Sequence, residues 1–464
     1  MPLALPLALI FSLLFGLLAW VLPGLSVIVL MVGIAGIVTV LRQPLWGLLL
    51  FGMLATFLPY TTVNIGFRTT VSEALILLVW ASVLLQKMLN NIGPPPKLMP
   101  TERWLIALML FSVVPFIAGQ AMVSAEGNGP VNWVRWLINL SVLFLVPRLL
   151  NTPKAREQMI IAILLGTLLL LLLSITVYLK DRTATSITSI LGHLGYGGIV
   201  TLEGSLQSFN SRMSSPWLHP NVTGGAMALL VPIALCFGFT RSGWPKALGI
   251  SVGLLGILAL AMTGSRGALI SMMVVLIWSA RQRIPYTGHI LWTAIAAGGV
   301  LLLVYPPLQD RLAGIFSTAD SGSTSVRLDE YQRFAQAVST FPLGIGFKVD
   351  AGVAGTGLLG ISNLFLNFMY KLGLPGMLLF IAVAVSWWRT VRPTRTPVVL
   401  TADNAIWLGT TLGVLAALVS GLFDHYFSFT QVLIALFWLM LGISLHEALR
   451  LKQKASLPFS GVPS

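Results

Sequence analysis

The sequence has few charged residues for its length. Of its 464 residues only 9% are Asp, Glu, Lys or Arg, whereas 56% are hydrophobic, and the mean hydropathy is +0.90. A soluble domain of this size needs a polar surface, so the composition excludes a soluble globular protein. The sequence predicts an all-α integral membrane protein, a polytopic helical bundle of about 12–14 transmembrane helices without a separate soluble domain.

Acidic residues and cysteine are also scarce. The chain has 14 acidic residues against 28 Lys and Arg, which leaves a net charge of +14, and its single cysteine is Cys236. One cysteine excludes an internal disulfide, and its position in an apolar stretch favours a packed thiol. The positive charge lies mostly in short loops between apolar runs, so we do not interpret it as a nucleic-acid surface.

Apolar runs long enough for membrane spans cover most of the chain. The spans predicted from these runs are 3–22, 24–41, 45–59, 70–86, 104–123, 133–150, 159–179, 222–240, 247–264, 267–280, 289–306, 363–388, 401–421 and 428–448.

Alternate loops are rich in Lys and Arg, which predicts the orientation, because cytoplasmic loops are enriched in these residues. With the N-terminus inside, two long loops at 180–221 and 307–362 face outward, and the second is expected to contain short helices. The basic residues of the inner loops are Arg42, Lys87, Lys97, Arg103, Arg148, Lys154, Arg156, Arg241, Lys246, Arg281, Arg283, Arg389, Arg392, Arg395, Arg450, Lys452 and Lys454.

A permanent cation, Arg266, interrupts the apolar run LALAMTGSRGALISMMVV at 258–275. An arginine at mid-membrane costs about 2.5–3.5 kcal/mol, so the run is better divided into two spans joined by a tight outer turn at Gly264–Gly267. One interpretation is an interfacial arginine that snorkels to lipid headgroups. The other is an anion site, because Arg212 and Arg327 also lie on the outer side, where the positive-inside tendency disfavours them.

Other polar residues are expected near these cations. His219 and Asn221 come directly before a span, and Asp424 and His425 lie in a very short outer turn. An acid and a titratable ring at this depth suit chemistry, although a structural Asp–Arg pair fits Asp424 equally well.

The second outer loop contains an amphipathic pattern, SVRLDEYQRFAQAVSTFP. It predicts an outer helix with Ser325 as N-cap and Pro342 as its stop, and with Arg327 in the first turn, where amide donors and the helix dipole add to an anion site. A solvated face with a local ion pair is the alternative for Arg327. The predicted apolar face is Leu328, Tyr331, Phe334, Ala335 and Val338. The glycines that follow, at 342–360, favour a mobile lid over a rigid strand.

Outward cations with acids and histidines suit a substrate that carries phosphate charge and reaches the site through the membrane. Arginines can hold a pyrophosphate by forked hydrogen bonds and stabilise it as it departs. A sugar hydroxyl that attacks an anomeric carbon must lose its proton, and Asp424, His425 and His219 are candidate bases.

The chain resembles the bacterial O-antigen ligase and O-antigen polymerase superfamily over most of its length. The resemblance rests on Arg212 with the Pro-Asn of HPN, on TGSRGAL, on VRLDEYQRFAQA with PLGIG, and on the terminal FDHYFSFTQVLIALFWLMLGIS. It implies a multi-pass enzyme of the bacterial inner membrane that transfers glycans from undecaprenyl pyrophosphate on the periplasmic face. It further implies that Arg212 and Arg266 bind the pyrophosphate, and that an inverting reaction proceeds without a metal or other cofactor.

The sequence departs from this family at one position. Family members commonly have a histidine at the start of the helix after the large periplasmic loop and a glycine eleven positions later, and here Ser362 and Gly373 occupy these places. Serine at its ordinary acidity is no base near neutral pH. Because the histidine is typical of ligases, we favour a polymerase of lipid-linked repeat units over a ligase to lipid A core, with Ser362 assigned to substrate binding.

Two classes of function other than glycan transfer remain open. A transporter of lipid-linked glycans would show charged residues at mid-span and paired broken helices. A scaffold for envelope polysaccharide assembly partners would need no chemistry. In each case membrane lipids surround the chain, whereas an acceptor glycan or lipid is expected only for the enzyme.

Overall fold

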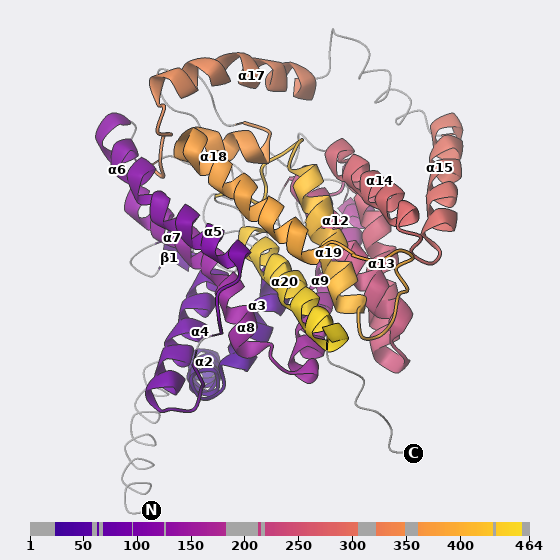
Figure 1. Ribbon diagram of the computed structural model, residues 1–464, viewed down its shortest axis with the longest axis horizontal. Helices are drawn as coiled ribbons and strands as arrows, with labels where there is room; N and C mark the ends of the chain where they lie inside the picture. Colours follow the sequence, from indigo (N-terminus) through magenta and orange to yellow (C-terminus); the bar gives the residue numbers. More distant parts are fainter. Residues whose placement is uncertain are drawn as a thin grey trace, which may run out of the picture.

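A computed structural model describes residues 24–57, 63–64, 68–94, 96–124, 127–181, 212–214, 219–304, 322–348, 361–429 and 433–456. The predicted span at 3–22 lies outside these ranges, as do most of the long loop at 180–221 and about half of the long loop at 307–362. The fold is a bundle of helices, shown in Figure 1.

The elements follow the predicted spans closely. They are α2 (Gly24–Arg42), α3 (Pro44–Phe57), β1 (Val63–Asn64), β2 (Arg68–Thr69), α4 (Val71–Met88), α5 (Pro100–Phe111), α6 (Val113–Met122), α7 (Gly129–Ser141), η1 (Val142–Leu145), α8 (Val146–Leu149), α9 (Pro153–Asp181), α12 (Pro220–Thr240), α13 (Gly243–Thr263), α14 (Arg266–Arg281), α15 (Thr287–Val304), α17 (Gly322–Thr340), α18 (Leu364–Val391), α19 (Ala405–Ser420) and α20 (Leu433–Ser456). The two strands pair antiparallel, Val63 with Thr69.

Within the described residues, eight helices are long and apolar enough to cross a membrane. They are α4, α5 with α6, α7 with α8, α9, α12, α13, α18 and α20, and parts of α2, α3 and α19 add shorter apolar helices. These helices confirm the predicted all-α, multi-pass membrane fold. Two predicted spans are divided near a proline: α6 begins at Val113, two residues before Pro115, and α8 begins at Val146, one residue before Pro147. Proline fits the first turn of a helix, where its missing N–H would have no partner within the helix.

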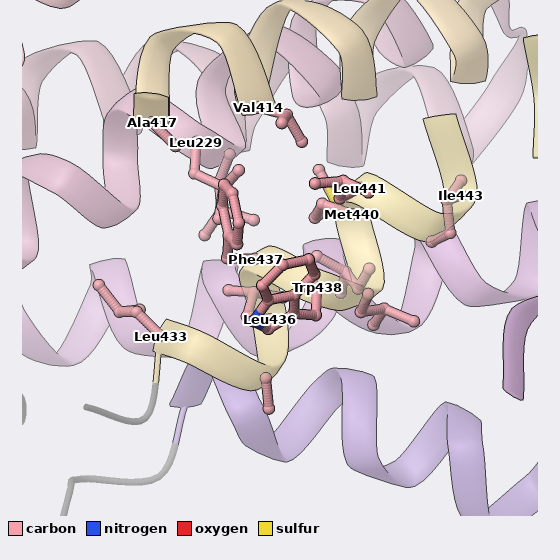
Figure 2. Close-up of a cluster of buried hydrophobic side chains, with 14 of the residues drawn as sticks. Leu229, Val414, Ala417, Leu433, Leu436, Phe437, Trp438, Met440, Leu441 and Ile443 are labelled. Carbon is pink, nitrogen blue, oxygen red and sulfur yellow. The ribbon is translucent and has the colours of Figure 1, made fainter. Parts of the chain in front are cut away.

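The core lies around α12, α19 and α20. Figure 2 shows Phe437 and Trp438 of α20 among Leu229 of α12 and Val414 and Ala417 of α19. The helices approach closely because α19 has a glycine at the crossing: a Cβ at residue 413 would lie 2.1 Å from the carbonyl oxygen of Leu229. In a lipid bilayer the hydrophobic effect does not drive helices together, so small residues at the crossings allow the close van der Waals contacts that hold them.

Ion pairs join α9, α19 and α20 at the end of the bundle opposite α17. Arg450 pairs with Asp403 at 2.7 Å and with the buried Glu447 at 2.9 Å, and Glu447 also pairs with Arg156. The α20 C-terminus and α17 lie at opposite ends in Figure 1. The basic residues of this cluster belong to the loops predicted to be inside, so the predicted inner and outer residues are separated in the fold.

Helix α17 confirms that the predicted segment is helical, but its buried face agrees only in part with the predicted one. Leu328 and Tyr331, expected on the apolar face, are 60% and 40% exposed. Phe334 of the predicted face does pack, together with Phe341, against a small core formed by Val123, Ala337, Ile345, Ile361 and Tyr370. The helix starts at Gly322, so Ser325 is not its N-cap, and Arg327 lies beyond the first turn, where the dipole argument no longer applies.

Helix α18 is broken at Gly373, which has φ 70° and ψ 176°, and Pro375 follows. The break frees backbone carbonyls that need partners in a membrane. The amides of Ile345 and Gly346 supply them, donating to Tyr370 and Lys371 over 3.0 and 2.9 Å. The described part of the glycine-rich segment is therefore bonded to α18 and does not form the expected lid, while 349–360 lies outside the described residues.

We expect Gly373→Ala to destabilise the protein by about 1–3 kcal/mol, because this backbone conformation is essentially restricted to glycine. The added Cβ would also lie 2.7 Å from the Pro342 carbonyl oxygen. Thermal unfolding of the protein in detergent measures the change. Gly36→Ala in α2 is the control, since a Cβ there meets no atom within 4 Å. Equal melting temperatures for the two variants would contradict the assigned strain.

Candidate functional site

The loop between α19 and α20 holds Asp424, whose side chain is largely buried. One carboxylate oxygen accepts the backbone N–H of His425 at 2.9 Å, and the other accepts the Asn221 amide at 3.3 Å. The His425 ring nitrogen Nδ1 lies 3.5 Å from the first oxygen. The two predicted residues therefore form a pair in which the carboxylate faces the imidazole.

Asn221 connects Asp424 to Arg212. Arg212 donates from Nη2 to the Asn221 side-chain oxygen, and from Nε to the Thr263 carbonyl at 2.8 Å. Thr263 is the last residue of α13, where unpaired carbonyls and the negative end of the helix dipole favour a cation. Hydrogen bonds thus run from the end of α13 through Arg212 and Asn221 to Asp424.

His219 is the N-cap of α12, and its Nδ1 accepts the backbone N–H of Asn221 at 3.1 Å. Burial lowers the pKa of this imidazole below its ordinary 6.5; Asp424 opposes the shift, and Arg212, His425 and Arg327 add to it. The ring is therefore neutral at neutral pH, with its proton on Nε2 because Nδ1 is an acceptor. His219 can donate a hydrogen bond to an anion, but this tautomer makes it unsuited to act as the base.

Tyr426 is a residue of this site that the sequence did not single out. Its ring fills the space beside α12, where a Cβ at residue 225 would lie 2.6 Å from Cδ2. Burial raises the pKa of the Tyr426 phenol well above 10, and the charge of Asp424 and a hydrogen bond with it raise the pKa further. The phenol therefore keeps its proton and supports the carboxylate. The neighbouring Asp424 and the glycine at 225 are the only signals in the sequence that could have found it.

Arg266 is the first residue of α14 and confirms the predicted turn between two helices. Gly264 adopts φ 57° after α13, and Ser265 is the N-cap of α14. The turn packs against both α12 and the loop that holds Asp424. At Gly224 of α12, an added Cβ would lie 2.6 Å from the Cβ of Ser265. At Gly267 of the turn, an added Cβ would lie 2.7 Å from the Cβ of Phe423, the residue before Asp424. The half-buried Arg266 therefore lies between the start of α12 and the loop that carries Asp424.

Arg327 and Ser362 connect α17 to this region. Arg327 lowers the pKa values of both His219 and Tyr426 through its charge, which places it near them. Ser362 donates from its backbone N–H and its hydroxyl to Glu330 of α17, at 2.8 and 3.2 Å. Ser362 thus holds α17 against the start of α18. Glu330, which the sequence analysis missed, shares the face of α17 that carries Arg327.

The predicted site residues thus lie close to one another or are held against α17, which carries Arg327 and binds Ser362 through Glu330. No cluster of three or more His, Cys, Asp or Glu residues that could hold a metal ion occurs in the part of the chain that the structure describes. The arrangement combines three arginines, a neutral imidazole donor and an Asp–His pair. Such a site can bind a multiply charged anion next to a group that takes up a proton.

Part of the chain matches a known protein family. Residues 251–381 match the model of the O-Antigen ligase family, which confirms the resemblance to the O-antigen ligase and polymerase superfamily. The matched segment contains Arg266, Arg327 and Ser362, whereas Arg212, His219, Asn221, Asp424 and His425 lie outside it. No curated protein matches the chain.

The depressed pKa of His219 predicts a pH dependence of stability. The unfolded chain binds this proton more tightly than the folded one, so the contribution of His219 is complete above pH 6.5 and is lost as the pH falls below it. We expect His219→Asn, which keeps a capping oxygen, to reduce the fall in melting temperature between about pH 7.5 and about pH 5.5. His289→Asn, at an exposed ring in α15, is the control. The same fall in both variants would refute the prediction.

Proposed function

We propose that the chain is a glycosyltransferase of bacterial surface polysaccharide synthesis. Its donor would be an oligosaccharide carried on undecaprenyl pyrophosphate, and its site would face the periplasm from the inner membrane. The family match supports a function of the O-antigen ligase or polymerase type in general. The observation that carries the more specific proposal is the Arg212–Asn221–Asp424 chain beside the Arg266 turn, because it puts cations next to an acid–imidazole pair.

In the proposed reaction, the acceptor hydroxyl oxygen attacks the anomeric carbon of the donor sugar. The bond from that carbon to the phosphate oxygen breaks, and its electron pair leaves with undecaprenyl pyrophosphate. Arg212, Arg266 and Arg327 would bind the pyrophosphate and stabilise its growing charge. His219 would add a neutral donor from Nε2. Attack opposite the leaving group inverts the anomeric configuration, and this chemistry needs no metal ion.

The hydroxyl proton would pass to the Asp424–His425 pair. With Nδ1 of His425 facing the carboxylate, Nε2 is left to take the proton, and Asp424 stabilises the imidazolium that forms. This assignment is favoured over Ser362, whose hydroxyl donates to Glu330 and which we now propose as a residue that positions α17. It is also favoured over His219, because Nδ1 of that ring already accepts the Asn221 N–H and Nε2 carries the proton.

Polymerisation of repeat units is favoured over transfer to lipid A core. The reason is Ser362, which stands where ligases typically have histidine and which donates hydrogen bonds to Glu330 of α17. Turnover of a lipid-linked oligosaccharide by the purified protein distinguishes the two, since chain growth indicates a polymerase and a product on lipid A indicates a ligase.

A transporter is less well supported. The break in α18 is the kind of feature that transporters use, but the carbonyls of Tyr370 and Lys371 already accept amides from the segment at 345–346. They are therefore occupied by the protein's own backbone. Asp403, a charged residue near a span end, is held by Arg450 and Lys454 at the end of the bundle away from the site.

We expect Arg266→Ala to abolish glycan transfer while the protein still inserts and purifies. Arg266→Lys should also be poor, because an ammonium keeps the charge and loses the forked geometry that fits phosphate. Arg333→Ala is the control, since Arg333 is an exposed arginine of α17 paired with Asp329. Full turnover by the Arg266→Ala protein would contradict the proposed pyrophosphate site and would support an arginine that only reaches the lipid headgroups.

We expect Asp424→Asn or His425→Ala to lower the transfer rate by about 10²–10⁴, the usual effect of losing a general base, with donor binding largely intact. Ser362→Ala should cost far less, because its backbone N–H still reaches Glu330. The measurement is turnover at saturating donor beside a binding assay for each variant. A dead Ser362→Ala protein together with near-native Asp424→Asn and His425→Ala proteins would show that the base is placed wrongly.

A further inference from the structure

A groove of about 470 Å³ lies between α4, α5 and the η1–α8 segment. This volume falls in the range of about 300–1,000 Å³ typical of ligand sites. Eight of its ten lining residues are apolar, among them Trp80, Ile106, Met109 and Phe144. Leu110 and Leu98 on its lining are 69% and 43% exposed, so the groove is open to the surroundings of the bundle.

The groove lies at the end of the bundle away from the candidate site. Glu102, which lines it, pairs with His446 near the C-terminal end of α20 at 3.2 Å. That end of α20 is opposite α17 in Figure 1. The groove therefore takes no part in the proposed glycan chemistry.

One cation, Arg148, stands at the groove. Its Cζ lies 5.4 Å from the centre of the Trp80 ring, and the Trp80 indole N–H donates to the Ser141 hydroxyl at 2.9 Å, which orients the ring. Arginines on the neighbouring helices form ion pairs with carboxylates, Arg135 with Glu73 and Arg156 with Glu447. Among the described residues no carboxylate forms an ion pair with Arg148.

The acid that lines the groove is already occupied. Glu102 accepts the backbone N–H of Met99 on one oxygen, at 2.7 Å, and faces His446 with the other. Lys97 is exposed and lies between Pro96 and Leu98, two residues that line the groove. The edge of the groove is thus cationic, while its walls are apolar, and this combination matches an anionic headgroup with an attached hydrocarbon chain.

We propose that this groove binds an anionic glycerophospholipid, with an acyl chain along the apolar walls and the phosphate at Arg148. The aromatic plane beneath the guanidinium and the groove beside it distinguish this site from an arginine that merely reaches the membrane surface. The Arg148 guanidinium can donate a forked pair of hydrogen bonds to the phosphate while the Trp80 ring holds the guanidinium in place.

The test uses the full chain reconstituted in nanodiscs of phosphatidylethanolamine with a minor fraction of phosphatidylglycerol. After extraction, native mass spectrometry measures the phosphatidylglycerol retained per protein. Arg148→Gln should lower retention about fivefold, the factor expected for one arginine at a lipid headgroup. Arg103→Gln makes the same change of charge at an exposed arginine outside the groove lining and should have little effect.

A second variant tests the groove itself. Ile106→Trp fills the space for the chain without removing the cation, and it should also lower retention. Equal losses from Arg148→Gln and Arg103→Gln would mean general charge attraction and overturn the proposal. Unchanged phosphatidylglycerol retention in both Arg148→Gln and Ile106→Trp would also overturn the proposal. So would a protein that is a dimer without bound lipid and that Ile106→Trp converts to a monomer, because a second copy would then cover the groove.

Discussion

The hydrogen bonds from Arg212 through Asn221 to Asp424 are the interaction on which the site depends. They join the carbonyl at the end of α13, the first turn of α12 and the loop before α20, which are far apart in the sequence. A buried carboxylate is costly unless it is paired and hydrogen-bonded. Asp424 meets this requirement with amide donors and an arginine linked through Asn221, so the same contacts hold the loop and place the carboxylate beside His425.

The second constraint comes from the membrane. Spans in lipid must satisfy every backbone polar group internally, so a helix can break only where the protein supplies partners. At Gly373 the partners come from the segment after α17, and α17 is in turn tied to the start of α18 through Glu330 and Ser362. The helix that covers the site and the break in α18 therefore stabilise one another.

Much of the fold could be predicted because the length and polarity of apolar runs reflect the thickness of a bilayer. The turn at Arg266 followed from the cost of a buried cation, and the structure has that turn, with Arg266 as the first residue of α14. The buried face of α17 was predicted only in part: Phe334 packs as expected, whereas Leu328 and Tyr331 fit the same helical period and are exposed. Which face is buried depends on Ile345, Ile361 and Tyr370, which come from other segments.

The candidate residues were recognised by type, but their partners were not predictable. Sequence alone could not show that Nδ1 of His219 accepts a backbone N–H, or that Ser362 is bound to Glu330, because both facts depend on how segments meet in space. Tyr426 was missed for the same reason. Its place in the site depends on a contact with Gly225, which lies about 200 residues earlier in the chain.

That contact means that the position of the acid is determined partly by an absent side chain. Gly225 leaves the space that the Tyr426 ring fills, and Tyr426 in turn supports Asp424. Under the proposed mechanism, turnover is therefore sensitive to the spacing between α12 and the loop. A methyl group added to α12 at residue 225 would then change turnover by displacing the Tyr426 ring and, with it, the acid.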